Sequence, residues 1–390
     1  MSHAVPLMLV WHLAVCLRPP RVTFGSLMAA AVLCRLAFLG GDPLLSDDVY
    51  RYVVEGNLLN HGGNPFITAP SHADAGLEHL TPHVNHSDMT SIYPPGATYL
   101  FSLIARVPAP STFQAFCIVA DLAVVSLWWT QGHRSAAIIW ALHPLVIVES
   151  AHNGHLESIA VAMAASAAVL PPSWRAGLTT LAAGTKLLPI LWLPRVLHGR
   201  TSIGGALIAV GLLATVSGPL IEAGMSGGSS LAAYTAHWSF NGALFGLLNP
   251  WFHTATRPVL MGLGLVAVCG AWARAPSALH TWLWCALAFV LLSPTAHPWY
   301  ALWLLAPAAL LQRTALMLTA GWLLAGYGVL SSLAHGGSWH EPDGLWAATW
   351  LPIAGVLLYD LRAAKRSSAP RHDTQVNPVA NNTMKGTLPQ

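Results

Sequence analysis

Charged side chains are what this sequence has least of. Of its 390 residues only 8% are charged, whereas 54% are hydrophobic, and the mean hydropathy is +0.54. A soluble globular protein carries about one quarter charged residues, so the composition argues against a soluble domain. Apolar runs long enough to span a bilayer, or nearly so, recur along the chain. We therefore predict an all-α polytopic membrane protein.

Several other features are absent. The five cysteines include no Cys-x-x-Cys pair and lie in apolar segments, which predicts small buried side chains rather than a disulfide framework or a zinc site. The net charge of +3 comes from scattered basic residues, so no nucleic-acid partner is expected. No internal repeat of fixed period is visible, and residues 1–17 lack the basic start of a signal peptide.

The predicted spans form one domain, residues 1–361. The apolar run 4–17 is short for a span and stays undecided, and the first clear span is 22–40. Later spans are predicted at 94–108, 112–130, 136–150, 155–171, 176–195, 202–221, 257–274, 278–293, 299–312, 315–333 and 343–361. This gives a bundle of about 11–13 transmembrane helices. The basic tail 362–390 is predicted to be disordered and cytoplasmic.

Acidic residues are concentrated in one long loop. Seven of the 15 acidic residues fall within 41–93, where Arg51 is the only basic residue. Arg18 and Arg21 precede the first clear span, so the positive-inside rule places the loop on the extracytoplasmic face. The polar segments 222–256 and 293–300 are expected to emerge on the same side.

The loop contains a predicted helix start. Ser46 is a good N-cap, so Asp47 and Asp48 would open a helix that runs to about Asn60. The apolar residues of this helix share one face, which predicts a short amphipathic helix on the membrane surface. The helix dipole would keep both carboxylates ionised, and an ionised carboxylate can accept a proton. The competing interpretation is that aspartate is simply common in first turns.

Other ionisable groups stand in or beside apolar runs, where burying a charge is costly and function is a frequent reason for it. One turn contains His152, Asn153, His155 and Glu157; it lacks the His-Glu-x-x-His order, and a metal site there is an alternative to a structural turn. Lys186 lies inside a predicted span. Three alternatives fit its charge: the side chain snorkels to the membrane surface, pairs with a glutamate, or binds an anionic lipid phosphate.

The side of the membrane on which the 152–157 turn lies depends on the run before it. If every run is a span, the turn is cytoplasmic and far from the aspartates. The run 136–150 is short enough to be re-entrant instead, which would bring the turn to their side.

Seven short motifs occur in a recognisable order along residues 46–300. They are Ser46–Gly56 (SDDVYRYVVEG), Gly63–Pro65 (GNP), Ile92–Pro95 (IYPP), His152–Glu157 (HNGHLE), Thr185–Pro189 (TKLLP), His237–Asn241 (HWSFN) and Ser293–Tyr300 (SPTAHPWY). Together they resemble the landmarks of bacterial GT-C superfamily glycosyltransferases, in particular the polyprenyl-phosphate-mannose-dependent mannosyltransferases.

The resemblance implies an inverting enzyme of the bacterial cytoplasmic (inner) membrane that moves a sugar, mannose in particular, from a polyprenyl-phosphate donor to a lipid or glycan acceptor on the extracytoplasmic face. It assigns the general base to Asp47 with Asp48 beside it, although the choice between the two stays open. It requires no cofactor, and a divalent cation is compatible with it. The residues expected to bind the donor phosphate or the substrate are Tyr50, Arg51, Glu55, Tyr93, Lys186, His237, Asn241, His297, Trp299 and Tyr300.

Two other classes of function fit parts of the pattern. A transporter could use buried histidine, lysine and glutamate as a substrate or proton path, although the inverted repeats common in transporters are not visible. A noncatalytic assembly subunit could retain the same fold. The long acidic loop favours an enzyme over a transporter.

Overall fold

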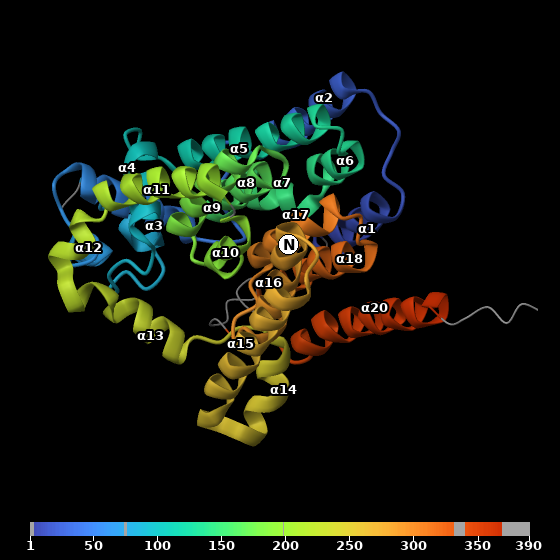
Figure 1. Cartoon of the computed structure of the whole chain (residues 1–390). Coiled ribbons are helices and arrows are strands. Elements are labelled where there is room, and N and C mark those ends of the chain that lie inside the picture. Colours follow the sequence, from blue (N-terminus) through green and yellow to red (C-terminus); the bar gives the residue numbers. More distant parts are fainter. Residues whose placement is uncertain (1–3, 74–75, 198, 331–339, 369–390) are drawn as a thin grey trace, which may run out of the picture.

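A computed structural model describes residues 4–73, 76–197, 199–330 and 340–368 (Figure 1). These residues form helices and no β-strand; isolated bridges join Phe240 and Asn241 to Thr295. The all-helical prediction is confirmed. Asp74 of the acidic loop and tail residues 369–390 lie outside the described residues.

The helices follow the predicted spans closely, although several spans are divided. The α-helices are α1 Ala4–Leu17, α2 Phe24–Leu36, α3 Asp48–Asn60, α4 Pro95–Ile104, α5 Pro110–Thr130, α6 Arg134–Leu142, α7 Pro144–Ile147, α8 Leu156–Val169, α9 Pro172–Thr185, α10 Leu193–Val196, α11 Gly199–Thr215, α12 Gly218–Ala223, α13 Ser229–His237, α14 Ala243–Phe252, α15 Thr256–Arg274, α16 Ala278–Leu292, α17 Leu302–Leu310, α18 Thr314–Trp322 and α20 Leu345–Ser368. A π-helical turn, Val148–His152, follows α7, and 3-10 turns occupy Leu188–Leu191, Pro298–Ala301 and Leu323–Val329.

Two helical stretches are long and apolar enough to cross a membrane, Pro110–Thr130 and the combined Ala243–Arg274. The number rises to four if each of two bent helix pairs counts as one span. Those pairs bend by 58° between α6 and the helix after it, and by 57° between α11 and the α12–α13 segment. Six further apolar helices are 10–17 residues long. Membrane insertion is thus indicated by a few helices, and the larger number of spans stays a prediction.

The main apolar core lies around α17, where almost every side chain is buried. Helices α1, α5, α6, α8, α16 and α18 contribute to the same cluster. A second, smaller cluster joins α3 to α4 and to the start of α5. The acidic loop is therefore anchored on the helical bundle through its own packed core.

The helix that begins at the aspartates is more buried than expected. α3 ends at Asn60 as predicted and starts at Asp48, with Asp47 as the N-cap residue. Val49 and nearly every residue from Arg51 to Leu58 are buried, so the prediction of an amphipathic helix lying on the membrane surface is wrong. The helix packs into the protein because α4 approaches its backbone closely at Gly56.

The predicted span 136–150 is broken at Pro144. Pro144 has no N–H, and the Leu145 amide donates instead to the His143 ring, which leaves the carbonyls of the preceding turn without their usual partners. Arg35 of α2 donates to the Ala141 carbonyl at 2.9 Å. The same guanidinium forms a buried ion pair with Asp121 of α5, with contacts of 2.6 and 2.8 Å.

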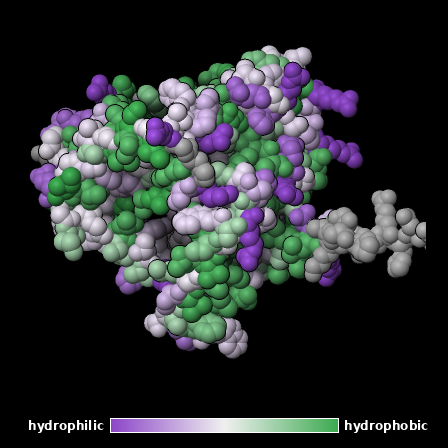
Figure 2. Space-filling model, viewed as in Figure 1, coloured by the Kyte–Doolittle hydropathy of each residue, from purple (hydrophilic) through white to green (hydrophobic). Residues whose placement is uncertain are grey.

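Helices α14 and α15 project from the body (Figure 1), and their surface is largely apolar (Figure 2). The exposed fractions of Trp251 and Met261 are 79% and 74%. The expected outer loop 222–256 is therefore mostly helical, and α14 belongs to a candidate span. At the other end, α20 continues through Ser368, so residues 362–368 of the predicted disordered tail are helical.

The contact at Gly56 yields a test of the α3–α4 packing. A Cβ atom at Gly56 would lie 2.3 Å from the Phe101 carbonyl oxygen, a backbone atom that cannot rotate away. We expect Gly56→Ala to lower the free energy of unfolding by about 1–3 kcal/mol through overpacking. The measurement is thermal unfolding of the detergent-solubilised protein.

Gly25→Ala in α2 is the matched control, because a Cβ there meets nothing within 4 Å. We expect its melting temperature to stay at or slightly above that of the wild type. Equal melting temperatures for the two variants would contradict the close helix approach.

Candidate functional site

One large cavity, of about 1120 Å³, lies beside the start of α3. Its walls come from the acidic loop, from the start of α8, from the break after α9, from α13 and from the 293–300 turn. The sequence-predicted residues that line it are Asp47, Asp48, Arg51, Tyr93, Glu157, Lys186, His237, His297, Trp299 and Tyr300. The fold thus gathers most of the predicted site in one place.

The two aspartates share one hydrogen-bond donor. Asn85, from the far end of the acidic loop, donates through Nδ2 to Asp47 Oδ1 at 2.7 Å and to Asp48 Oδ1 at 2.9 Å. Ser46 Oγ accepts from the Asp48 backbone N–H at 3.3 Å. Ser46 therefore supports the start of the helix as predicted, although Asp47 takes the N-cap position.

The environments of the two carboxylates differ. Surrounding protein atoms and the neighbouring charge of Asp48 raise the pKa of Asp47, against the Asn85 hydrogen bond that lowers it. The Asp47 side chain nevertheless reaches the protein surface. Burial alone would raise the pKa of Asp48, but the charge of His155 and the Asn85 hydrogen bond outweigh it and lower the pKa. Asp47 therefore has the higher proton affinity of the pair.

Arg51 ties the acidic loop together. Its Nη1 pairs with Glu55 at 2.9 Å, as the four-residue spacing suggests, and donates to the Met89 carbonyl. Its Nη2 donates to the carbonyls of Asn85 and His86 at 2.6 Å each. Glu55 is fully enclosed behind Arg51 and lies outside the cavity walls. These contacts position Asn85 above the aspartates.

A buried hydrogen-bond network stands behind Asp48. The Glu149 carboxylate accepts from His155 Nδ1 at 2.5 Å, from Tyr327 at 2.6 Å and from Asn153 at 3.0 Å. The other ring nitrogen of His155 lies 2.9 Å from Ser46 Oγ and 3.7 Å from Asp48 Oδ2. Three donors thus converge on the buried carboxyl group of Glu149.

These contacts correct the placement of the 152–157 turn. His155 touches Ser46 and lies beside Asp48, so the turn is on the same side as the aspartates. The expectation that the turn lies far from the aspartates is therefore wrong, and the 58° bend in this run fits either a broken span or a re-entrant loop. The break at Pro144 and the π-helical turn together redirect the chain.

Lys186 ends α9 instead of lying within a continuous helix. Its backbone is extended, with φ −140°, so the predicted span 176–195 is interrupted there. The ammonium lies 2.7 Å from Glu157 Oε1 and 4.8 Å from the centre of the Tyr93 ring. Of the three alternatives for Lys186, the pairing with a glutamate is therefore observed. Neither carboxylate oxygen of Glu157 accepts an aligned hydrogen bond, although both are buried.

Aromatic rings form another part of the cavity wall. The ring of His297 stacks on that of Trp299, with centroids 4.3 Å apart, and on that of Phe240, with centroids 4.8 Å apart. Burial lowers the pKa of His297 to about 4, so the ring is neutral near pH 7 and can donate a hydrogen bond. Tyr300 contacts Tyr234 through their hydroxyls at 3.2 Å.

Five other predicted residues lie outside the large cavity, among them His155, whose contacts are described above. Tyr50 stacks on His83 at the outer side of the loop. His152 accepts from the Leu44 N–H, and Asn153 binds Glu149. Asn241 is buried against Thr349 of α20, with its backbone N–H donated to Glu341.

The sequence did not identify Asn85 and Tyr327 as site residues, nor did it identify the central role of Glu149 in the hydrogen-bond network. Asn85 carries no local signal, because its role comes from a contact across 38 positions of the loop. Glu149 was visible as an ionisable residue in an apolar run, which is itself a signal of function. Tyr327 lies 178 positions from Glu149 and could not be paired with it by spacing.

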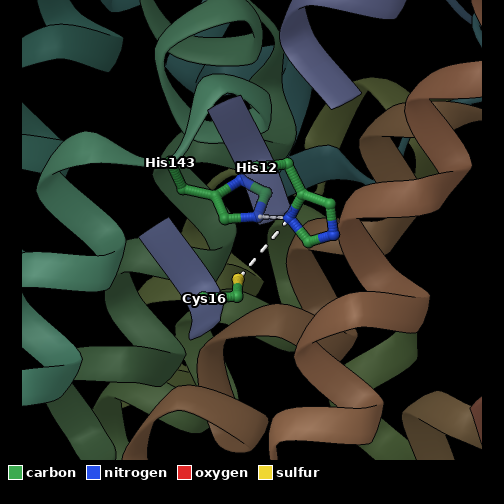
Figure 3. A group of neighbouring side chains, drawn as sticks. All are labelled: His12, Cys16 and His143. Atoms are coloured by element: carbon green, nitrogen blue, oxygen red, sulfur yellow. Dashed lines mark hydrogen bonds between the residues drawn. The ribbon is translucent and has the colours of Figure 1, made fainter. Parts of the chain in front are cut away.

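A group of side chains of the kinds that bind metal ions lies elsewhere in the fold. The ligand atoms of His12, Cys16 and His143 lie within 4.8 Å of one another and could hold a metal ion (Figure 3). His12 Nδ1 is 2.8 Å from His143 Nε2, and Cys16 Sγ is 3.5 Å from His12 Nδ1. His143 also caps α7 by accepting the Leu145 N–H, so the rings form a hydrogen-bonded support for the helix break. Cys269 on α15 is exposed, contrary to the expectation of a buried side chain.

Comparison of the chain with protein-family models, with curated proteins and with solved structures finds no match in any of the three.

Proposed function

We propose that the chain is an inverting glycosyltransferase with a GT-C-like bundle that uses a polyprenyl-phosphate sugar, mannose in particular, as donor. The observation that carries the proposal is the single cavity in which Asp47, Asp48, Lys186 and His297 meet, although they come from distant parts of the sequence. The order of motifs along the sequence supports the same conclusion. The bundle would include the shorter apolar helices as spans, with the cavity on the extracytoplasmic side.

The cavity has the two kinds of wall that such a donor needs. One part carries the ammonium of Lys186 and the ring of His297, which suit a phosphate. The remaining wall is largely apolar and suits a prenyl chain; it includes Leu188, Phe289 and Leu330. A bound phosphate would compete with Glu157 for the ammonium of Lys186, because these two groups are in contact.

The reaction is a single displacement at the anomeric carbon. The acceptor hydroxyl oxygen forms a bond to that carbon, and its proton passes to the Asp47 carboxylate. The bond between the anomeric carbon and the phosphate oxygen breaks, and its electron pair leaves on the phosphate. Lys186 and His297 stabilise the charge that develops there. One displacement inverts the configuration, as in inverting glycosidases.

The base is assigned to Asp47 on physical grounds. When two neighbouring carboxylates have different proton affinities, the one with the higher affinity accepts the proton and the other stays ionised. Asp47 has the raised pKa and an exposed side chain, whereas the charge of His155 holds Asp48 ionised. Asp48 then contributes negative charge beside the developing oxocarbenium character of the sugar.

Replacement of the base gives the first functional test. We expect Asp47→Asn to lower the rate of sugar transfer by about 10²–10⁴-fold, because an amide cannot accept the proton. The assay measures transfer from radiolabelled polyprenyl-phosphate mannose into lipid or glycan by membranes that contain the protein. Asp88→Asn is the matched control, since Asp88 is an exposed acid of the same loop outside the cavity wall.

Full transfer by Asp47→Asn would rule out its role as base. Absence of transfer by the wild type with every polyprenyl-phosphate sugar tried would favour a transporter or a noncatalytic subunit instead.

The pH dependence gives a separate test of how the aspartates interact. Transfer needs ionised Asp47, so kcat/KM should fall as the pH drops through the pKa of Asp47. The charge of Asp48 raises that pKa, and its removal in Asp48→Asn should therefore move the acid limb of the profile to lower pH. The measurement is kcat/KM against pH for the wild type and for the residual activity of Asp48→Asn. An acid limb that moves to higher pH would contradict the assignment.

A further inference from the structure

A second cavity also borders Asp47. Its volume is about 820 Å³, and it shares Pro43, Leu44 and Asp47 with the large cavity. Its remaining walls are the 40–42 turn, the first turn of α3, the 79–83 segment of the acidic loop and the start of α5. Asp47 thus borders two cavities, whereas Asp48 borders only the first among the residues that line them.

The walls of the second cavity differ chemically from those of the first. Neither lysine nor arginine lines it, and its ionisable residues besides Asp47 are Asp42, His79 and His83 of the acidic loop, together with Tyr50. The rings of Tyr50 and His83 stack with centroids 4.9 Å apart and planes 26° apart. The cavity therefore combines hydrogen-bond acceptors with an aromatic pair, and it offers no cation for a phosphate.

An inverting displacement needs two opposed approaches to one carbon. The leaving group departs on one side and the acceptor hydroxyl arrives on the other, next to the base. The cationic and apolar groups that suit a prenyl phosphate lie in the first cavity. A hydroxyl that reaches Asp47 from the second cavity would approach from outside the cavity that suits that leaving group.

We propose that the second cavity is the acceptor subsite and that it takes a carbohydrate, whose hydroxyls bind the carboxylates and whose ring packs on the Tyr50–His83 pair. This inference rests on the proposed function for the direction of transfer. The volume lies within the range of small-molecule sites and accommodates one or two sugar units. Most of the walls come from the polar loop, so the acceptor sugar enters from the aqueous side rather than along the bilayer.

The test separates acceptor binding from donor binding. Radiolabelled polyprenyl-phosphate mannose is the donor and methyl α-mannoside is the soluble acceptor probe. We expect Tyr50→Ala and His83→Ala each to raise the KM for the mannoside by about tenfold while the KM for the donor changes by less than about twofold. Tyr99→Ala is the control, since Tyr99 is an exposed tyrosine of α4 outside both cavities. A rise in the donor KM, or no change in either KM, would overturn the assignment.

A binding measurement keeps the inference testable if the proposed function fails. Saturation-transfer NMR detects methyl α-mannoside on the detergent-solubilised protein without any turnover. We expect the signal in the wild type and in Tyr99→Ala, and its loss in Tyr50→Ala. If Tyr50→Ala loses the signal and the wild type shows no transfer, the proposed enzyme function is contradicted while the sugar site is supported. An unchanged signal in Tyr50→Ala would remove the sugar site, whatever the transfer assay shows.

Discussion

Pro144 lacks a backbone N–H, and the placement of the candidate site depends on how the fold accommodates the helix break that results. The Ala141 carbonyl accepts from Arg35, and the Leu145 amide donates to the ring of His143, which His12 supports in turn. Asp121, which forms the buried ion pair with Arg35, also accepts a hydrogen bond from the Ser150 hydroxyl. Ser150 lies within the π-helical turn that follows the break. Polar groups from α1, α2 and α5 thus stabilise the bend that brings His155 beside Asp48.

The bend places a polar group, the carboxyl of Glu149, in the interior of an otherwise apolar region. Burial of such a group is costly unless it finds hydrogen-bond partners. His155, Asn153 and Tyr327 supply those partners, and His155 extends the network to Ser46 at the start of α3. Because a partly satisfied buried network is unfavourable, the C-terminal turn at Tyr327 and the acidic loop are held in one arrangement. The cavity is consequently bounded by segments that are far apart in the sequence.

Local patterns in the sequence were sufficient for the positions of most helices outside 222–256, for the end of α3 and, to within one residue, for its start. They were also sufficient for the Arg51–Glu55 pair, because four-residue spacing in a helix determines that contact. They were insufficient for the breaks at Pro144 and Lys186, since hydropathy does not distinguish a span from a bent helix of the same length. They were equally insufficient for the burial of α3, which follows from close packing on α4 at Gly56.

The difference between the two aspartates also follows from local geometry. Successive residues of an α-helix project about 100° apart, so side chains at the N-cap and at the first helical position point in different directions. Asp47 faces the boundary between the two cavities, and Asp48 lies beside His155. Asn85 donates to both carboxylates and so holds them together without making them equivalent. Two chemically identical neighbours can therefore take different roles, because burial and the charge of Asp48 dominate at Asp47, whereas the partners of Asp48 outweigh its burial.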